Sequence, residues 1–261
     1  MSNRPNKSRH EPVYAAAIAA GRAYFGGILG LKPVIEGADN IPATGGAILA
    51  ITHFGYMDFA LTEWLAWTHT RRRIRFLAKK GAFDKPVVGW LLRGMHHISV
   101  DMKAGSAAYS QAIEALHAGE ILGVFPEAGV SASFTVRELK TGAVRMAAEA
   151  GVPIVPVALW GGQLLRTKNH KARFAEARRA PISVAFGSPQ LVDANDDVTV
   201  ATGRLRDTLQ ALLDGLQRDY PLNGDGQWWQ PAHLGGSAPT PETAAAAEAE
   251  RQLRKAETGK G

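Results

Sequence analysis

The stretch Gly46-Ala47-Ile48-Leu49-Ala50-Ile51-Thr52-His53-Phe54-Gly55-Tyr56-Met57-Asp58 carries both a fold signal and a chemical one. Its apolar run from Ala47 is typical of a buried strand, which ends in the polar pair Thr52-His53. A helix-compatible segment begins near Asp58, where a carboxylate suits a first turn. We therefore predict that His53 and Asp58 face each other across one tight connection, as a carboxylate-oriented general base requires.

The His-x4-Asp pattern alone can arise by chance in a chain with eight histidines. Other predicted strands strengthen its interpretation as a functional site. Short apolar runs alternate with helix-like segments, and this predicts an α/β single domain with a mixed, mostly parallel sheet flanked by helices. Ligands bind such sheets beyond the carboxyl ends of the strands. Three predicted strands end in polar groups, namely Thr52-His53, Lys79-Lys80 and Pro126-Glu127. We expect these groups to converge.

Composition and absent motifs exclude several function classes. The chain has no Cys, which excludes disulfides, thiolate metal sites and Cys nucleophiles. It also lacks a Gly-x-Ser-x-Gly elbow, a P-loop, a Gly-x-Gly-x-x-Gly fingerprint and a His-Glu-x-x-His site. His96 and His97 are adjacent, so on a strand they face opposite sides and are poor joint metal ligands. We therefore predict no metal and no cofactor.

Four segments are expected along the 261 residues. Residues 1–11 form a flexible basic N-terminus, and residues 12–31 an apolar helix that either lies in a membrane interface or packs on the domain. Residues 32–234 form the main domain, and residues 235–261 a mobile or loosely helical tail. The net charge of +6 fits an anionic membrane or phosphate-bearing ligands. Nucleic acid is not an expected partner, because no recognition module is present.

Four motifs in order resemble those of the glycerolipid (lysophospholipid) acyltransferases, typified by the 1-acylglycerol-3-phosphate acyltransferases. They lie at 52–58 (Thr-His-Phe-Gly-Tyr-Met-Asp), 94–101 (Gly-Met-His-His-Ile-Ser-Val-Asp), 124–131 (Val-Phe-Pro-Glu-Ala-Gly-Val-Ser) and 152–158 (Val-Pro-Ile-Val-Pro-Val-Ala). The resemblance covers roughly residues 34–159. It implies transfer of a fatty acyl group from acyl-CoA or acyl carrier protein to a lysophospholipid hydroxyl, in phospholipid synthesis or remodelling. It also implies a peripheral or monotopic protein at the cytoplasmic face of the membrane.

The resemblance assigns roles to particular residues. His53 would be the general base on the acceptor hydroxyl and Asp58 its orienting carboxylate, with no enzyme nucleophile. Backbone N–H groups near Gly55 or Gly129 would stabilise the oxyanion. Glu127 would be an acceptor-site or a structural carboxylate.

The phosphate end departs from the family pattern, because Val130 and Met102 stand where arginines are usual. Nearby groups would replace them or are simply structural or solvent-facing, namely Lys79, Lys80, His97, Arg137 and Lys140. The leading acceptor is 1-acylglycerol-3-phosphate. The alternatives are a different lipid acceptor, a thioester or lipid hydrolase, and a non-catalytic lipid- or protein-binding module.

Overall fold

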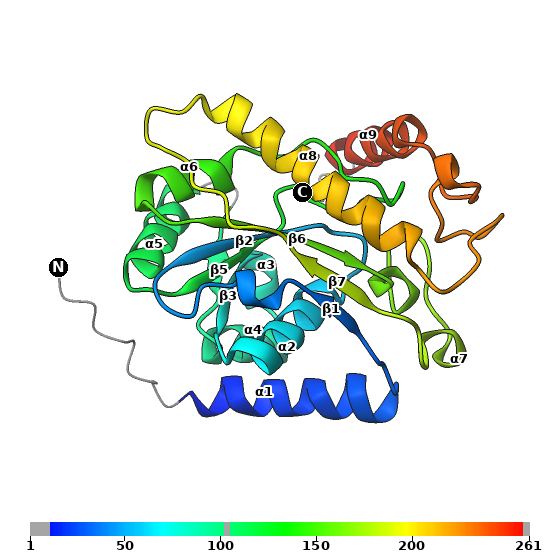
Figure 1. Cartoon of the computed structure of the whole chain (residues 1–261), viewed down its shortest axis with the longest axis horizontal. Helices are drawn as coiled ribbons and strands as arrows, with labels where there is room; N and C mark the ends of the chain where they lie inside the picture. The colour runs from blue at the N-terminus through cyan, green and yellow to red at the C-terminus, as the bar shows by residue number, and fades with distance from the viewer. Residues whose placement is uncertain (1–10, 102–104, 258–261) are drawn as a thin grey trace.

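The computed structural model describes residues 11–101 and 105–257, and in this part the chain forms one sheet between two layers of helices (Figure 1). The predicted N-terminal segment before Glu11 and the position of Met102 lie outside the described residues. The sheet consists of β1 (Val34–Glu36), β2 (Ala47–Ile51), β3 (Ile74–Lys79), β4 (Ile98–Val100), β5 (Ile121–Val124), β6 (Ile154–Trp160) and β7 (Ser183–Phe186).

The strand order is β1-β7-β6-β2-β5-β3-β4. The pairs from β6 to β4 are all parallel, whereas β7 runs antiparallel to β6 and pairs in parallel with β1. The predicted mixed, mostly parallel α/β sheet is thereby confirmed. Strands β2, β5 and β6 are buried along their whole length, because helices cover both faces of the sheet. Their side chains therefore do not alternate between a buried and an exposed face.

Helices flank the sheet on both faces (Figure 1). One layer contains α1 (Pro12–Arg22), α2 (Asp58–Thr70) and α4 (Pro86–Gly94), and the other α5 (Gly105–His117), α6 (Gly142–Ala150) and α8 (Val198–Arg218). The short α3 (Lys80–Phe83) lies at the carboxyl end of β3, against α4. Short elements connect them, namely η1 (Ala23–Ile28), η2 (Ala38–Asn40), η3 (Gly162–Leu164), α7 (Phe174–Ala177) and η4 (Ala232–Leu234). Because β2, β5, β3 and β4 pair in parallel, their carboxyl ends lie at one edge of the sheet, and the candidate site lies there.

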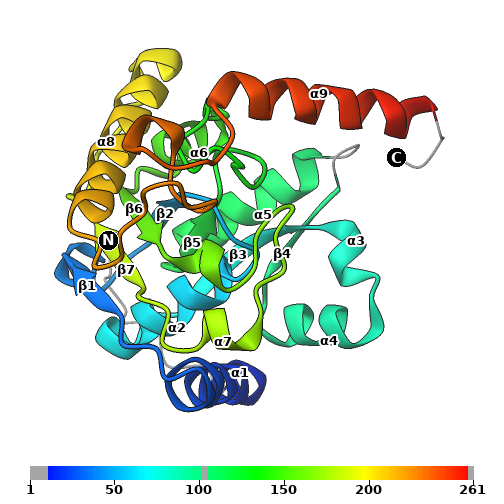
Figure 2. The ribbon, with the colours of Figure 1, turned by 90° about the vertical axis from the view of Figure 1, so that its right-hand side faces the viewer.

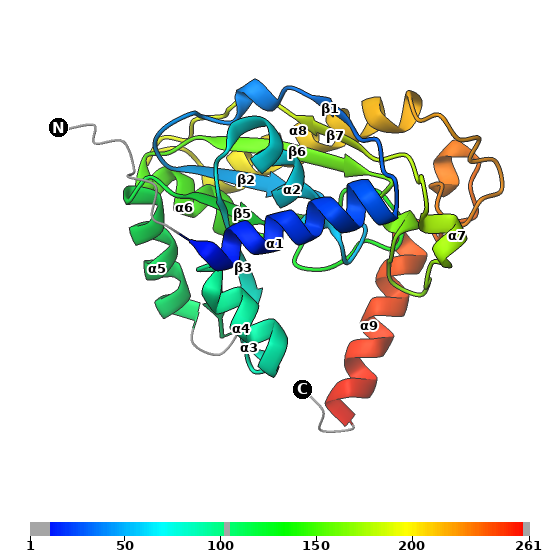
Figure 3. The ribbon, with the colours of Figure 1, turned by 90° about the horizontal axis from the view of Figure 1, so that it is seen from below.

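The apolar segment predicted at 12–31 forms α1 and continues as the π-helix η1. It lies against α2 and α4 (Figure 3). Tyr14 is fully buried, and its hydroxyl accepts a hydrogen bond from the Ile74 amide at 3.0 Å. Glu11 pairs with the Arg75 guanidinium at 2.7 Å, so this residue of the expected flexible terminus is held on the domain. In the described part of the chain, no helix is both long and apolar enough to cross a membrane.

The C-terminal segment is a regular helix, α9 (Pro241–Glu257), where a mobile or loosely helical tail was expected. Its run of alanines and charged residues has high helix propensity. An ion pair between Glu248 and Lys168 attaches its first half to the domain. Its second half projects away from the domain (Figures 2 and 3).

Candidate active site

The loop between β2 and α2 is organised around one carboxylate oxygen. Asp58 is the first residue of α2, and its Oδ2 accepts hydrogen bonds from the backbone amides of Phe54 at 2.8 Å and Gly55 at 2.7 Å. The same oxygen lies 3.1 Å from His53 Nδ1. A carboxylate only accepts hydrogen bonds, so Nδ1 carries the proton, and in the neutral form of the ring the lone pair is on Nε2. The predicted pairing across a tight connection is the arrangement that the structure has.

Glycines make room for this buried carboxylate. A Cβ at Gly55 would lie 2.9 Å from Asp58 Oδ1, and one at Gly162 only 2.4 Å from it. Both distances are shorter than a carbon side chain tolerates, so larger residues would push the carboxylate off His53. The Asp58 side chain is 1% exposed, whereas that of His53 is 17% exposed. The His53 ring therefore reaches solvent while the Asp58 carboxylate does not.

Glu127, in the loop after β5, holds the backbone of the same site. Its Oε1 accepts from the His53 amide at 2.9 Å and its Oε2 from the Arg137 amide at 3.0 Å. The Ser131 amide in turn donates to the His53 carbonyl at 2.8 Å. Burial raises the pKa of Glu127 to about 7, although the two amide donors favour its charged form. Both oxygens are thus occupied by backbone, which favours the structural alternative for Glu127.

His53 lines a cavity of about 640 Å³ at the carboxyl ends of the strands. Its ring stacks on Phe125, with centroids 4.2 Å apart and planes inclined by 26°. Its lining includes apolar residues, namely Leu77, Ala78, Val100, Val124, Phe125, Ala143 and Met146. It also includes polar or charged residues, namely His53, Tyr56, Lys79, Lys140, Lys168 and Glu248. The cavity beside His53 therefore offers contacts both to an apolar chain and to an anionic group.

The structure brings only some of the predicted binding residues to this cavity. Lys79, Lys140 and Gly129 line it. Lys80 is exposed and does not line it, and its ammonium lies 3.3 Å from Asp101. His97 is not brought to the cavity either: it is 7% exposed, and its Nδ1 accepts from the Phe76 amide at 3.0 Å. Burial lowers the pKa of His97 to about 4, so the ring is neutral and supplies no positive charge.

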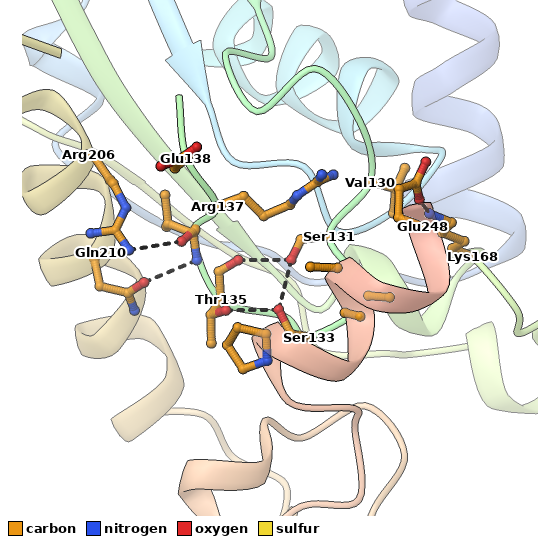
Figure 4. Close-up of a pocket in the computed structure, with 15 residues that line it drawn as sticks. Val130, Ser131, Ser133, Thr135, Arg137, Glu138, Lys168, Arg206, Gln210 and Glu248 are labelled. Atoms are coloured by element: carbon orange, nitrogen blue, oxygen red, sulfur yellow. Dashed lines mark hydrogen bonds and ion pairs between the residues drawn. The ribbon is translucent and has the colours of Figure 1, made fainter. Parts of the chain in front are cut away.

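Arg137 lines a second cavity of about 430 Å³, which adjoins the first between α8, α9 and the loop after β5 (Figure 4). Val130, Lys168 and Glu248 line both cavities. The sequence did not point to Lys168 or Glu248. They lie 80 residues apart and outside the four motifs, so no local pattern links them.

The described residues contain no group of three or more His, Cys, Asp or Glu side chains placed to hold a metal ion. The chemistry that this arrangement supports is proton transfer by His53 from a bound hydroxyl, with a cavity for an apolar chain beside it.

Comparison with known proteins shows which family the segment that carries the site is similar to. Residues 32–160 match the family model described as Acyltransferase. A 1-acyl-sn-glycerol-3-phosphate acyltransferase from Bacillus subtilis is 35% identical over 124 residues, which cover 47% of this chain and 60% of the relative. One from Borreliella burgdorferi is 28% identical over 145 residues, 54% of this chain and 56% of the relative. The chain thus spans a little over half the length of these two relatives.

A solved structure has the same fold. The crystal structure of PlsC, the 1-acyl-sn-glycerophosphate acyltransferase from Thermotoga maritima, matches with a TM-score of 0.66 and 23% sequence identity. The match covers 83% of this chain and 86% of that one. The family model and the relatives from Bacillus subtilis and Borreliella burgdorferi confirm the predicted resemblance to the glycerolipid acyltransferases, and the crystal structure confirms the fold.

Proposed function

We propose that this chain, whose residues 32–160 match the Acyltransferase family model, transfers a fatty acyl group from an acyl thioester to the free hydroxyl of 1-acylglycerol-3-phosphate. The observation that carries this proposal is the His53–Asp58 pair, 3.1 Å apart, at the wall of a cavity that is lined by both apolar side chains and lysines. The names of the relatives from Bacillus subtilis and Borreliella burgdorferi support the choice of acceptor.

His53 acts as the general base. Its Nε2 takes the proton of the acceptor hydroxyl, and the oxygen attacks the thioester carbonyl carbon. Asp58 keeps the proton on Nδ1 and stabilises the imidazolium that forms. The tetrahedral intermediate then collapses, the carbon–sulfur bond breaks, and the leaving thiolate takes the proton from Nε2. The base is regenerated, and no covalent acyl-enzyme is needed.

The oxyanion of the intermediate is stabilised by the Gly129 amide. Of the two amides expected from the sequence, that of Gly55 already donates to Asp58 Oδ2 at 2.7 Å. Gly129 lines the cavity, and its amide makes no hydrogen bond to any described residue. It follows Ala128, whose φ of 57° is in the left-handed region. Such a backbone amide, fixed before the reaction, is the kind of donor that acyl transfer requires.

The donor is acyl-CoA or an acyl carrier protein, and the apolar lining residues of the cavity receive its acyl chain. The reaction then belongs to phospholipid synthesis or remodelling. A transferase with a cavity that is open to solvent must keep water from attacking the thioester in place of the acceptor hydroxyl. In a hydrolase, water is the attacking molecule.

We propose a peripheral or monotopic location at the cytoplasmic face of the membrane. Helices α1 and α4 lie on one face of the molecule (Figure 3). In α4, Val87 is 79% exposed and Trp90 62%, and Ile28 of η1, which continues α1, is 57% exposed. Exposed aromatic and aliphatic side chains, with the exposed Lys85 at the start of α4, fit an anionic lipid surface. Trp90→Glu should reduce sedimentation with anionic vesicles while leaving the melting temperature unchanged, and equal sedimentation would contradict this location.

The test of the function is an acceptor panel. The full-length protein is offered labelled acyl-CoA, or acyl carrier protein, together with 1-acylglycerol-3-phosphate, other lysophospholipids or 1-acylglycerol, and products are identified by mass spectrometry. We expect a diacylglycerol-3-phosphate product that depends on the acceptor. Release of free fatty acid at the same rate without any acceptor would identify a hydrolase. No turnover with any donor and acceptor would contradict acyl transfer and favour a non-catalytic lipid- or protein-binding module.

A further inference from the structure

The two cavities meet at Val130, Lys168 and Glu248. Val130 is only 8% exposed and apolar, so it supplies no charge to an anionic substrate. Any cation at this junction must therefore come from elsewhere in the fold. Two cations are available there, and both are attached to the loop that carries His53.

Arg137 is the first of these cations. Its amide is bonded to Glu127, which also holds the His53 amide. Its guanidinium extends towards Val130, Lys168 and Glu248, and away from Arg206 and Gln210 (Figure 4). A Cβ at Gly129 would lie 3.4 Å from Arg137 Nη1, so the guanidinium reaches the edge of the His53 cavity. It forms no hydrogen bond or ion pair with the described residues.

Lys168 is the second cation. The hydroxyl of its neighbour Thr167 donates to the Phe54 carbonyl. The Arg166 carbonyl accepts from the Tyr56 amide at 2.8 Å. These bonds fix the Lys168 backbone against the loop between His53 and Asp58. Its ammonium is paired with Glu248 of α9, and this pairing lowers the pKa of Glu248.

The position of these cations matches the shape of the proposed acceptor. In 1-acylglycerol-3-phosphate only a few bonds separate the free hydroxyl from the phosphorus atom. When the hydroxyl is at His53 Nε2, the phosphate must therefore lie close to the same loop. A phosphate dianion is bound well by an arginine fork together with a lysine point charge.

We propose that Arg137 and Lys168 bind the phosphate of the acceptor at this junction, and that Glu248 of α9 is its internal substitute when no acceptor is bound. The inference rests on the proposed acyl transfer. The phosphate competes with Glu248 for Lys168, so the carboxylate of α9 weakens acceptor binding. Lys168 and Glu248, which lie outside the matched segment 32–160, thereby set the affinity for a charged acceptor together with Arg137.

The test compares the full-length wild type with Arg137→Gln, Lys168→Gln and Glu248→Gln at a saturating acyl thioester. The acceptors are 1-oleoylglycerol-3-phosphate and its phosphate-free analogue 1-oleoylglycerol. Loss of a charged hydrogen bond should raise the KM for the phosphorylated acceptor by about 10- to 100-fold in either cation variant, with kcat little changed. Glu248→Gln should lower that KM by about 3- to 10-fold, because it frees Lys168. None of the three should alter the KM for 1-oleoylglycerol.

Matched controls carry the same charge changes away from the junction. Lys171→Gln removes an exposed cation of the same loop, and Glu250→Gln removes an exposed carboxylate of α9. Both should behave as wild type. Combining Lys168→Gln with Glu248→Gln should abolish most of the gain from Glu248→Gln, since the two side chains act as a pair. Lys168→Arg should keep most of the affinity and so separates loss of charge from damage to the loop.

A binding titration separates this inference from the proposed function. Lysophosphatidate is titrated into His53→Ala protein with and without the substitutions at Arg137 and Lys168. If wild type makes no acylated product but binding still depends on both cations, the proposed function fails and the phosphate site stands. If wild type transfers the acyl group and both cation variants keep its KM and affinity, or lose activity equally with 1-oleoylglycerol, the phosphate site is wrong.

Discussion

The His53 loop and the Arg137–Lys168 junction are neighbours, yet they are held in different ways. Asp58 is buried and accepts three hydrogen bonds on one oxygen from residues no more than five positions away. The junction instead relies on long, partly exposed side chains, one of which is paired with a residue 80 positions distant. A buried network fixes geometry strongly, whereas exposed ion pairs contribute little and exchange partners readily. The first arrangement suits a catalytic group, and the second suits a site that must take up and release a charged lipid.

The largest expected effect is on the rigid side of this comparison. His53→Ala removes the proposed base, and we expect kcat to fall by about 10³- to 10⁴-fold, because proton transfer from the hydroxyl is lost. Steady-state rates with labelled acyl thioester measure it, and circular dichroism checks that the protein is folded. His69→Ala, at an exposed histidine of α2, is the matched control. A folded His53→Ala protein with wild-type rates would rule out the mechanism.

The next largest effect should come from Asp58→Asn. The amide keeps the size of the side chain but removes the charge that stabilises the imidazolium, so we expect kcat to fall by about 100-fold with the acceptor KM nearly unchanged. Because Asp58 also accepts two backbone hydrogen bonds, the melting temperature should decrease too. A loss seen in KM alone would mean that Asp58 acts in binding and not through His53.

Glu127→Gln tests how the carboxyl group that holds the His53 loop affects stability as the pH changes. The raised pKa of about 7 means that folding favours protonated Glu127 over the ionised form. The stability that Glu127 adds relative to Gln is therefore fully present below its unfolded pKa and is lost as pH rises through about 7. Urea unfolding of both proteins at pH 5 and pH 8 should show wild type losing stability relative to Glu127→Gln. Glu138→Gln, at an exposed neighbour, is the matched control.

The smallest effects should lie on the exposed side, at two adjacent lysines. Lys79 lines the His53 cavity, whereas Lys80 does not and is paired with Asp101. We expect Lys79→Gln to raise the acceptor KM by about 3-fold, and Lys80→Gln to change it by less than about 2-fold. Equal effects of both substitutions would mean that the lysines attract the lipid through general surface charge and not through the cavity.

Much of the fold could be predicted because its signals are local. The fully apolar runs of β2, β5 and β6 indicated a sheet covered on both faces, and alternation with helices indicated parallel pairing. The antiparallel pairing of β7 with β6 left no such signal, since strand direction depends on the path of the connection between them. The helicity of α9 follows from its own residues, whereas its attachment to the domain through Glu248 and Lys168 is a long-range contact that no local pattern shows.

The sequence by itself determined the pairing of His53 with Asp58, because both lie on one short connection between a strand and a helix. It also indicated that Lys79, Lys140 and Gly129 belong near this pair, since strand ends meet at one edge of a parallel sheet. Only the tertiary structure decided that His97 is buried and neutral, that Glu127 is occupied by backbone amides, and that Lys168 meets Glu248. Burial and long-range ion pairs depend on how distant segments pack, and a linear pattern does not carry that information.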